Sequence, residues 1–150
     1  MTVTTHSPDE TTAVGLRLGK LLKPLDVICL YGNLGSGKTT LTKGLAKGAG
    51  CRGRVMSPTF GLAREYRGKR LTLHHLDLYR VDADQTGDIG IEDFVRDPRA
   101  ACVIEWPEAG EIFYPKDRLE VRLAHAAGAR RLAFKARGKR SRALLAGIAR

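Results

Sequence analysis

The sequence predicts an α/β fold whose sheet combines buried parallel strands with a closing pair of antiparallel strands. Val27 to Tyr31 is a short, nearly all-apolar run, as expected for a strand buried on both faces of a parallel sheet. A glycine-rich loop and a helical pattern follow this run directly. Near the end of the chain, apolar residues alternate in two runs separated by Gly128, which predicts two paired antiparallel strands.

The first half of the chain contains two predicted helices. The first begins at Ser7-Pro8-Asp9-Glu10, where serine can cap, proline suits the first helical position and Glu10 occupies the capping-box position. Apolar residues then repeat at helical spacing until Pro24 ends the helix. The second helix starts near Lys38, and Gly50 fits its C-terminal cap. Another short strand is predicted at Val55 and Met56.

The second half begins with a predicted hairpin. Its strands are residues 62–67 and 70–76, around a type II′ turn at Gly68-Lys69. A loop, a short helix, a buried strand and a final helix are predicted over residues 82–90, 91–95, 101–104 and 141–148. No internal repeat or linker is visible, so we expect a single domain over residues 1–150 with a basic C-terminal segment, 135–150.

Composition indicates a soluble intracellular protein. Of 150 residues, 43% are apolar and 28% are charged, which is ordinary for a soluble domain. The longest apolar runs are far short of the roughly 20 residues that cross a bilayer, and no secretory signal is visible. The three cysteines show no metal-binding spacing and fit a reducing compartment. We therefore expect a cytoplasmic location and no membrane contact.

The chain is strongly basic. Lysine and arginine number 26 against 16 acidic residues, a net charge of +10, and much of the excess follows Ala129. Such a charge attracts polyanions. A solvated, solubilising edge and a surface that contacts RNA are both consistent with it, and charge alone does not choose between them.

A complete phosphate-binding motif follows the first buried strand. Residues 32–39 read GNLGSGKT and match G-x-x-x-x-G-K-[ST], between a strand and a helix. Glycines let successive N–H groups curl toward phosphate oxygens, and the helix that starts near Lys38 adds its positive dipole end. Lys38 is then placed for the β- and γ-phosphates and the Thr39 hydroxyl for Mg²⁺. The motif predicts a P-loop that binds ATP and Mg²⁺.

Two acidic residues end predicted apolar strands. Glu105 follows the run from Ala101 to Ile104, and Asp77 follows Leu73-His74-His75-Leu76. A P-loop needs an acidic partner for its metal, usually at the end of a neighbouring strand. One carboxylate can serve the metal while the other orients or deprotonates the attacking water. The pattern by itself leaves open which residue does which.

Three further features each have a functional and a plainer structural explanation. Thr59, in Ser57-Pro58-Thr59-Phe60, is either a sensor of the γ-phosphate or part of a proline-capped turn. Trp106, the single tryptophan, either stacks on the nucleotide or fills the core. His74 and His75 are adjacent, so they point to opposite faces of a strand and cannot form a metal pair. We interpret both histidines as packing or surface residues.

Taken together, the motifs resemble the TsaE (YjeE) family, the ATPases of bacterial tRNA threonylcarbamoyladenosine biosynthesis. The resemblance extends from about residue 7 to about residue 131 and rests on five segments: GNLGSGKTT from Gly32, SPTF from Ser57, HLDLYR from His75, Gly90-Ile91 and IEWPE from Ile104. It implies a three-layer α/β P-loop NTPase fold with antiparallel strands added to the sheet. It also implies ATP hydrolysis in partnership with the TsaB and TsaD proteins.

The resemblance also assigns roles to individual residues. Asp77, Lys38 and Thr59 correspond to the catalytic group, and Thr39 with Glu105 to the Mg²⁺ site. The nucleotide would contact Glu10, Thr11, Trp106, an arginine at 130 or 131, for which we favour Arg131, and the P-loop residues Asn33, Leu34, Gly35, Ser36, Gly37, Lys38, Thr39 and Thr40. Asn33 departs from the family, which commonly has aspartate there, and we expect this change to alter local charge without removing activity.

Two other functions remain open at this point. A small-molecule kinase would need an acceptor-binding region for which the chain has little spare length. A nucleotide-dependent regulator or RNA-binding protein would hold ATP without releasing phosphate. No motif assigns an arginine to the γ-phosphate, so we expect an ATPase that is weak alone and stimulated by its partners.

Overall fold

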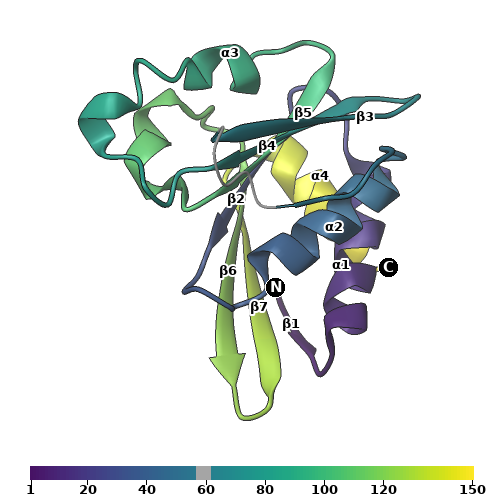
Figure 1. The fold of residues 1–150 in the computed structure, drawn as a ribbon. Coiled ribbons are helices and arrows are strands. Elements are labelled where there is room, and N and C mark those ends of the chain that lie inside the picture. Colours follow the sequence, from purple (N-terminus) through teal and green to yellow (C-terminus); the bar gives the residue numbers. More distant parts are fainter. Residues whose placement is uncertain (57–61) are drawn as a thin grey trace.

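The computed structural model describes residues 1–56 and 62–150, and in these residues seven strands form one mixed sheet (Figure 1). The strands lie in the order β1-β7-β6-β2-β5-β4-β3. Their bounds are β1 Thr2–Thr5, β2 Val27–Tyr31, β3 Ala63–Arg67, β4 Thr72–Asp77, β5 Ala100–Glu105, β6 Leu119–Ala126 and β7 Ala129–Ala136. Strand β2 is parallel to β5 and β6, β4 is parallel to β5, and the outer pairs are antiparallel.

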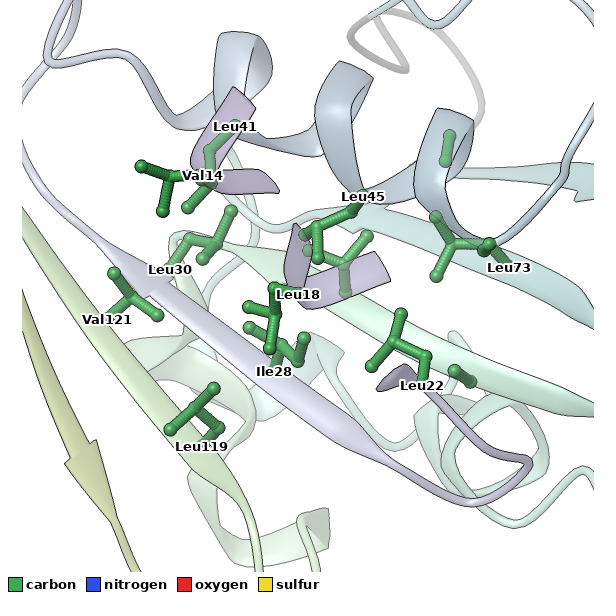
Figure 2. Close-up of a cluster of buried hydrophobic side chains, with 14 of the residues drawn as sticks. Val14, Leu18, Leu22, Ile28, Leu30, Leu41, Leu45, Leu73, Leu119 and Val121 are labelled. Atoms are coloured by element: carbon green, nitrogen blue, oxygen red, sulfur yellow. The ribbon is translucent and has the colours of Figure 1, made fainter. Parts of the chain in front are cut away.

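Helices cover both faces of the sheet. They are α1 (Pro8–Leu21), α2 (Lys38–Gly48), α3 (Ile91–Val95) and α4 (Lys139–Ile148), with short 3-10 segments η1 (Ala83–Gln85) and η2 (Pro107–Phe113). Ile28 and Leu30 of β2 pack against α1 and α2 (Figure 2). Val27, Cys29 and Tyr31 face the other way and pack with residues of α3. This alternation within one buried strand separates two cores and confirms the predicted mixed α/β fold.

The start of α1 has the predicted Ser7 N-cap, but the Glu10 carboxylate bonds a different amide from the Ser7 amide that a capping box uses. The Glu10 amide donates to the Ser7 hydroxyl oxygen at 3.1 Å, as an N-cap requires. The Glu10 carboxylate instead accepts from the His6 amide at 2.8 Å. Glu10 is therefore occupied with securing the entry to the helix.

Helices α1 and α2 contact one another backbone to backbone. Four glycines make this possible, Gly15 and Gly19 in α1 and Gly44 and Gly48 in α2. A Cβ atom added to any of them would collide with a backbone carbonyl oxygen of the opposite helix. Leu18 and Leu45 fill the core beside this contact (Figure 2). The position of α2, whose first residue is Lys38, is thus fixed directly by α1.

The structure differs from the predicted secondary structure in several places. Strand β1, which pairs with β7 at the sheet edge, was not expected. Val55 and Met56 do not form a strand, because the Tyr66 hydroxyl bonds both backbone groups of Met56. The β3–β4 connection spans residues 68–71 rather than forming a two-residue turn. The reason is that Leu71 is buried and the Arg70 guanidinium donates to carbonyl oxygens of α1 and of its C-cap residue.

The basic C-terminal segment is partly an internal structural element. The Arg140 guanidinium donates to both carboxylate oxygens of Asp26, at 2.9 and 2.6 Å, and to the Leu21 carbonyl oxygen at 2.7 Å. Arg137 contacts the buried Glu120 carboxylate at 2.9 Å. These arginines therefore anchor α4 and β7 to the rest of the fold. Among the described residues, no helix is long and apolar enough to cross a membrane.

Candidate functional site

The loop between β2 and α2 has the backbone conformation that its glycines allow. Gly35 and Gly37 have φ angles of 75° and 105°, in the left-handed region that favours glycine. Gly37 is also the N-cap of α2, so the following amides are left without side-chain capping. A helix N-terminus that ends in such a loop presents N–H donors and a positive dipole to anions.

Lys38 is folded against the loop that precedes it. Its ammonium group donates to the carbonyl oxygens of Gly32 at 2.6 Å and Asn33 at 2.9 Å. It also lies 4.3 Å from the centroid of the Trp106 ring. Burial lowers the pKa of Lys38, and the carboxylates of Glu105 and Asp77 oppose that shift. The cation is thus held between the loop and an aromatic face.

Glu105 and Asp77 lie side by side at the carboxyl ends of β5 and β4. The two residues are paired in the parallel register of these strands. The Thr39 hydroxyl lies 3.2 and 3.3 Å from the Glu105 carboxylate oxygens, and the Glu105 side chain is 3% exposed. Asp77 is half-buried, and burial raises its pKa, although the Tyr79 amide donates to it at 3.0 Å and opposes the shift.

These residues line one hollow of about 240 Å³ beside the loop. Trp106 closes one side of it. Its backbone is left-handed, with φ at 54°, and its ring packs against Tyr79 with centroids 4.8 Å apart. The lining consists of Leu34, Gly35, Gly37, Lys38, Thr39, Thr40, Asp77, Tyr79, Glu105 and Trp106. Asn33 and Ser36 do not line it; Asn33 is exposed, and Ser36 is fully buried within the loop.

A second hollow, of about 270 Å³, lies on the other side of the loop and shares Gly35, Gly37 and Thr40 with the first. It is lined as well by Thr11 and Arg130, together with Thr5, His6, Ser7, Pro8, Gly128 and Ala129. Glu10 and Arg131 are not among its lining residues. Arg131 is exposed on β7. Because consecutive side chains of a strand point to opposite faces, Arg131 points away from the face that Arg130 occupies.

The oxygen donors near the loop suit a Mg²⁺ ion. No group of three or more histidine, cysteine or acidic residues able to hold a metal occurs in the described part of the chain. Mg²⁺ at phosphate sites needs only one or two carboxylates, with the remaining ligands supplied by phosphates and water. The Thr39 hydroxyl and the Glu105 carboxylate lie within hydrogen-bonding distance of one another. Together they offer two oxygen ligands for a Mg²⁺ ion at this position.

Two site neighbours were missed or misread from the sequence. His75 was interpreted as packing or surface, but its Nε2 atom lies 2.9 Å from the Glu105 carboxylate. The available signal was its position two residues before Asp77, on the same face of β4. Tyr79, although part of the HLDLYR segment, was assigned no role in the site. Thr59, with the rest of Ser57–Phe60, lies outside the described residues.

Comparison with known proteins identifies the family. The model for "Threonylcarbamoyl adenosine biosynthesis protein TsaE" matches residues 5–133. The chain belongs to the TsaE family. It is 38% identical to the TsaE protein of Bacillus subtilis over 91% of this chain and 85% of that one. It is 34% identical to the Haemophilus influenzae TsaE protein, over 87% of each.

A solved TsaE-like structure has the same fold. A crystal structure of YdiB from Bacillus subtilis superposes with a TM-score of 0.85 and 31% identity, over 99% of this chain and 93% of that one. The TsaE family model ends at residue 133, whereas this superposition covers nearly the whole chain. The expected family resemblance is therefore confirmed, and it gives this chain a role in tRNA threonylcarbamoyladenosine biosynthesis.

Proposed function

We propose that this chain is a Mg²⁺-dependent ATPase that acts with TsaB and TsaD in threonylcarbamoyladenosine modification of tRNA. The observation that carries the proposal is the meeting of Lys38, Thr39, Glu105 and Asp77 around a single hollow beside the P-loop. A cation, a hydroxyl and two carboxylates are the groups that phosphoryl transfer to water requires.

The roles follow from the position of each group. In the proposed reaction, water attacks the γ-phosphorus, the bond to the β–γ bridging oxygen breaks, and ADP and phosphate leave. Lys38 and the loop amides bind the phosphate oxygens, and Thr39 with Glu105 would hold Mg²⁺, which would supply neutralisation of the developing charge. Asp77, with its raised pKa, is placed to orient the water and take its proton. Trp106 flanks the nucleotide.

The second hollow suits the nucleoside end of ATP. It adjoins the P-loop and carries Thr11, whose hydroxyl lies 2.7 Å from that of Thr5, and Arg130. We therefore assign the C-terminal nucleotide contact to Arg130 in preference to Arg131. Glu10 would support this contact indirectly, by holding the start of α1.

The proposed tRNA contact is best placed beside α2. Lys43, Lys47, Arg52 and Arg54 are exposed there, and three of them line a hollow of about 400 Å³. No acidic residue occurs in the sequence between Asp26 and Glu65. Phosphate contacts of this kind weaken steeply with salt, so charge reversal at Lys43 and Lys47 should flatten the salt dependence of tRNA affinity. A tRNA-modifying role also supports a cytoplasmic location.

Phosphate release is the measurement that tests the ATPase proposal. Steady-state release is measured for the chain alone, and again with purified TsaB–TsaD and tRNA, at fixed ATP and Mg²⁺. We expect slow release alone and a clear increase with the partners. ATP binding without release in either case would favour a nucleotide-dependent regulator. Release that requires a small-molecule acceptor would favour a kinase.

A further inference from the structure

A buried histidine supports the Glu105 carboxylate from behind the hollow. The His75 Nε2 atom lies 2.9 Å from Glu105 Oε1, and the two side chains are 0% and 3% exposed. A carboxylate only accepts hydrogen bonds, so Nε2 is the donor. The hydroxyls of Thr39 and Thr42 approach the same carboxylate from α2, with Thr42 Oγ1 3.4 Å from Oε1. Glu105 is thereby held from both sides.

The histidine is itself held by Tyr66. The Tyr66 hydroxyl lies 3.2 Å from His75 Nδ1, and Tyr66 is 5% exposed. The Met56 amide donates to the same hydroxyl oxygen at 3.3 Å, and the Met56 carbonyl oxygen lies 3.0 Å from it, so the single hydroxyl hydrogen points either to that carbonyl oxygen or to His75 Nδ1. A continuous hydrogen-bonded path therefore runs from Glu105 through His75 and Tyr66 to the backbone of Met56.

Strand register explains why these side chains meet. In β4, His75 and Asp77 share a face, and β4 pairs Asp77 with Glu105 of β5. On the other side, β3 pairs Arg64 with His75 and Tyr66 with Leu73. Both ring nitrogens of His75 have partners. By contrast, Nδ1 of His74, on the opposite face, has no hydrogen-bond partner within the described residues.

We propose that His75 is the positioning residue of the metal carboxylate and that Tyr66 links this carboxylate to the backbone at Met56. The inference rests on the proposed Mg²⁺ role of Glu105. A ligand oriented by a buried donor loses little freedom when the metal binds, and removing such a donor typically weakens metal affinity about 10–100-fold. Met56 directly precedes Ser57 in sequence, so the path ends where the predicted phosphate-sensing residues begin.

Mg²⁺ titrations test the positioning role. Affinity for a non-hydrolysable ATP analogue is measured by calorimetry, across Mg²⁺ concentrations and in chelator. In His75→Ala we expect the Mg²⁺ requirement to rise about 10–100-fold with little change in chelator. His75→Gln, whose amide can still donate to Glu105, should recover most of the loss. His74→Gln is the matched control in the same strand and should leave the Mg²⁺ requirement unchanged.

Two outcomes would overturn the positioning role. One is an equal loss of affinity with and without Mg²⁺ in folded His75→Ala or His75→Gln protein. The other is an unchanged Mg²⁺ requirement in His75→Ala while Glu105→Gln raises it, which would leave the proposed metal site standing. If Glu105→Gln also leaves the Mg²⁺ requirement unchanged, the proposed metal site itself fails.

Amide hydrogen exchange tests the link to Met56 without nucleotide. The Met56 amide should exchange at least several-fold faster in Tyr66→Phe, which loses the acceptor oxygen but keeps the ring. It should also exchange faster in His75→Ala, because the hydroxyl then loses one of its fixed partners. Exchange at Met56 that matches the unmodified protein in His75→Ala would remove the link.

Discussion

Asp77 and Glu105 occupy paired positions of two parallel strands, yet their surroundings differ. Glu105 is buried and accepts hydrogen bonds from Thr39 and His75. Asp77 is half-buried beside the same hollow and accepts only from the Tyr79 amide among the contacts described for its side chain. Two carboxylates in unlike environments are suited to different tasks.

The first prediction separates these tasks. Glu105→Gln should raise the Mg²⁺ concentration needed for nucleotide binding, because the amide cannot replace an anionic oxygen ligand. Asp77→Asn should bind nucleotide and Mg²⁺ nearly normally but turn over about 10²–10⁴-fold more slowly, since it cannot take a proton. Calorimetry and phosphate release measure the two effects. If Mg²⁺ affinity fell only in the Asp77 variant, the two roles would be reversed.

The second prediction concerns pH and the stability of the nucleotide-free protein. Burial raises the pKa of Asp77 in the folded state, so the folded protein binds this proton more tightly than the unfolded chain. Stability from this group therefore falls as pH rises from the unfolded pKa through the raised folded pKa. Asp77→Asn should be more stable than the unmodified protein at pH 7, and this advantage should vanish in acid. Denaturant unfolding at several pH values measures it. A constant difference at all pH values would contradict the assignment.

The third prediction is that Lys38→Ala loses turnover. The variant lacks the ammonium group that would contact the transferring phosphoryl group, a kind of donor whose removal costs about 10²–10³-fold in rate. Lys20→Ala, an exposed lysine of α1, is the control and should keep normal turnover. Near-normal phosphate release by folded Lys38→Ala protein would argue against the P-loop as the reaction site.

The fourth prediction tests the internal role of the basic C-terminal segment. Arg140→Ala should lower the free energy of unfolding by about 3 kcal/mol, because the Asp26 carboxylate, 4% exposed, is left without its bidentate partner. Arg142→Ala, an exposed arginine of the same helix, should change it by no more than about 0.5 kcal/mol. Chemical denaturation compares the two. Equal losses would mean that the Asp26 contact contributes little.

The fifth prediction concerns the contact between α1 and α2. Replacing glycine by alanine inside an exposed helix normally stabilises it by up to about 1 kcal/mol. Gly44→Ala should do the opposite and destabilise by about 1–3 kcal/mol, because the new methyl group would strike the Thr12 carbonyl oxygen. Gly87→Ala has open space and serves as the control. A Gly44→Ala protein as stable as the control would show that the helices can separate without cost.

The sequence predicted features that depend on local pattern. The capped helix, the P-loop and the two strand-end carboxylates follow from spacing alone, and parallel strands necessarily bring Asp77 and Glu105 to one edge. Contacts between distant side chains were not predictable in this way. The alternation of β4 indicates the face on which His75 lies, but not that Tyr66 and Glu105 face it there. Strand β1 was missed because it is a short edge strand with a single buried residue, Thr5.

The glycine contact between α1 and α2 also fixes the distance between the two hollows beside the P-loop. Helix α1 begins beside Thr11, which lines one hollow, and α2 begins at Lys38, which lines the other. Because no side chains lie between the helices at Gly15 and Gly44, there is no compressible layer to absorb relative sliding. If ATP spans both hollows as proposed, the helix pair would hold its two binding regions at a fixed separation. Under that proposal, a nucleotide with a longer or shorter span between its base and its terminal phosphate would fit poorly, because the two helices cannot slide to accommodate it.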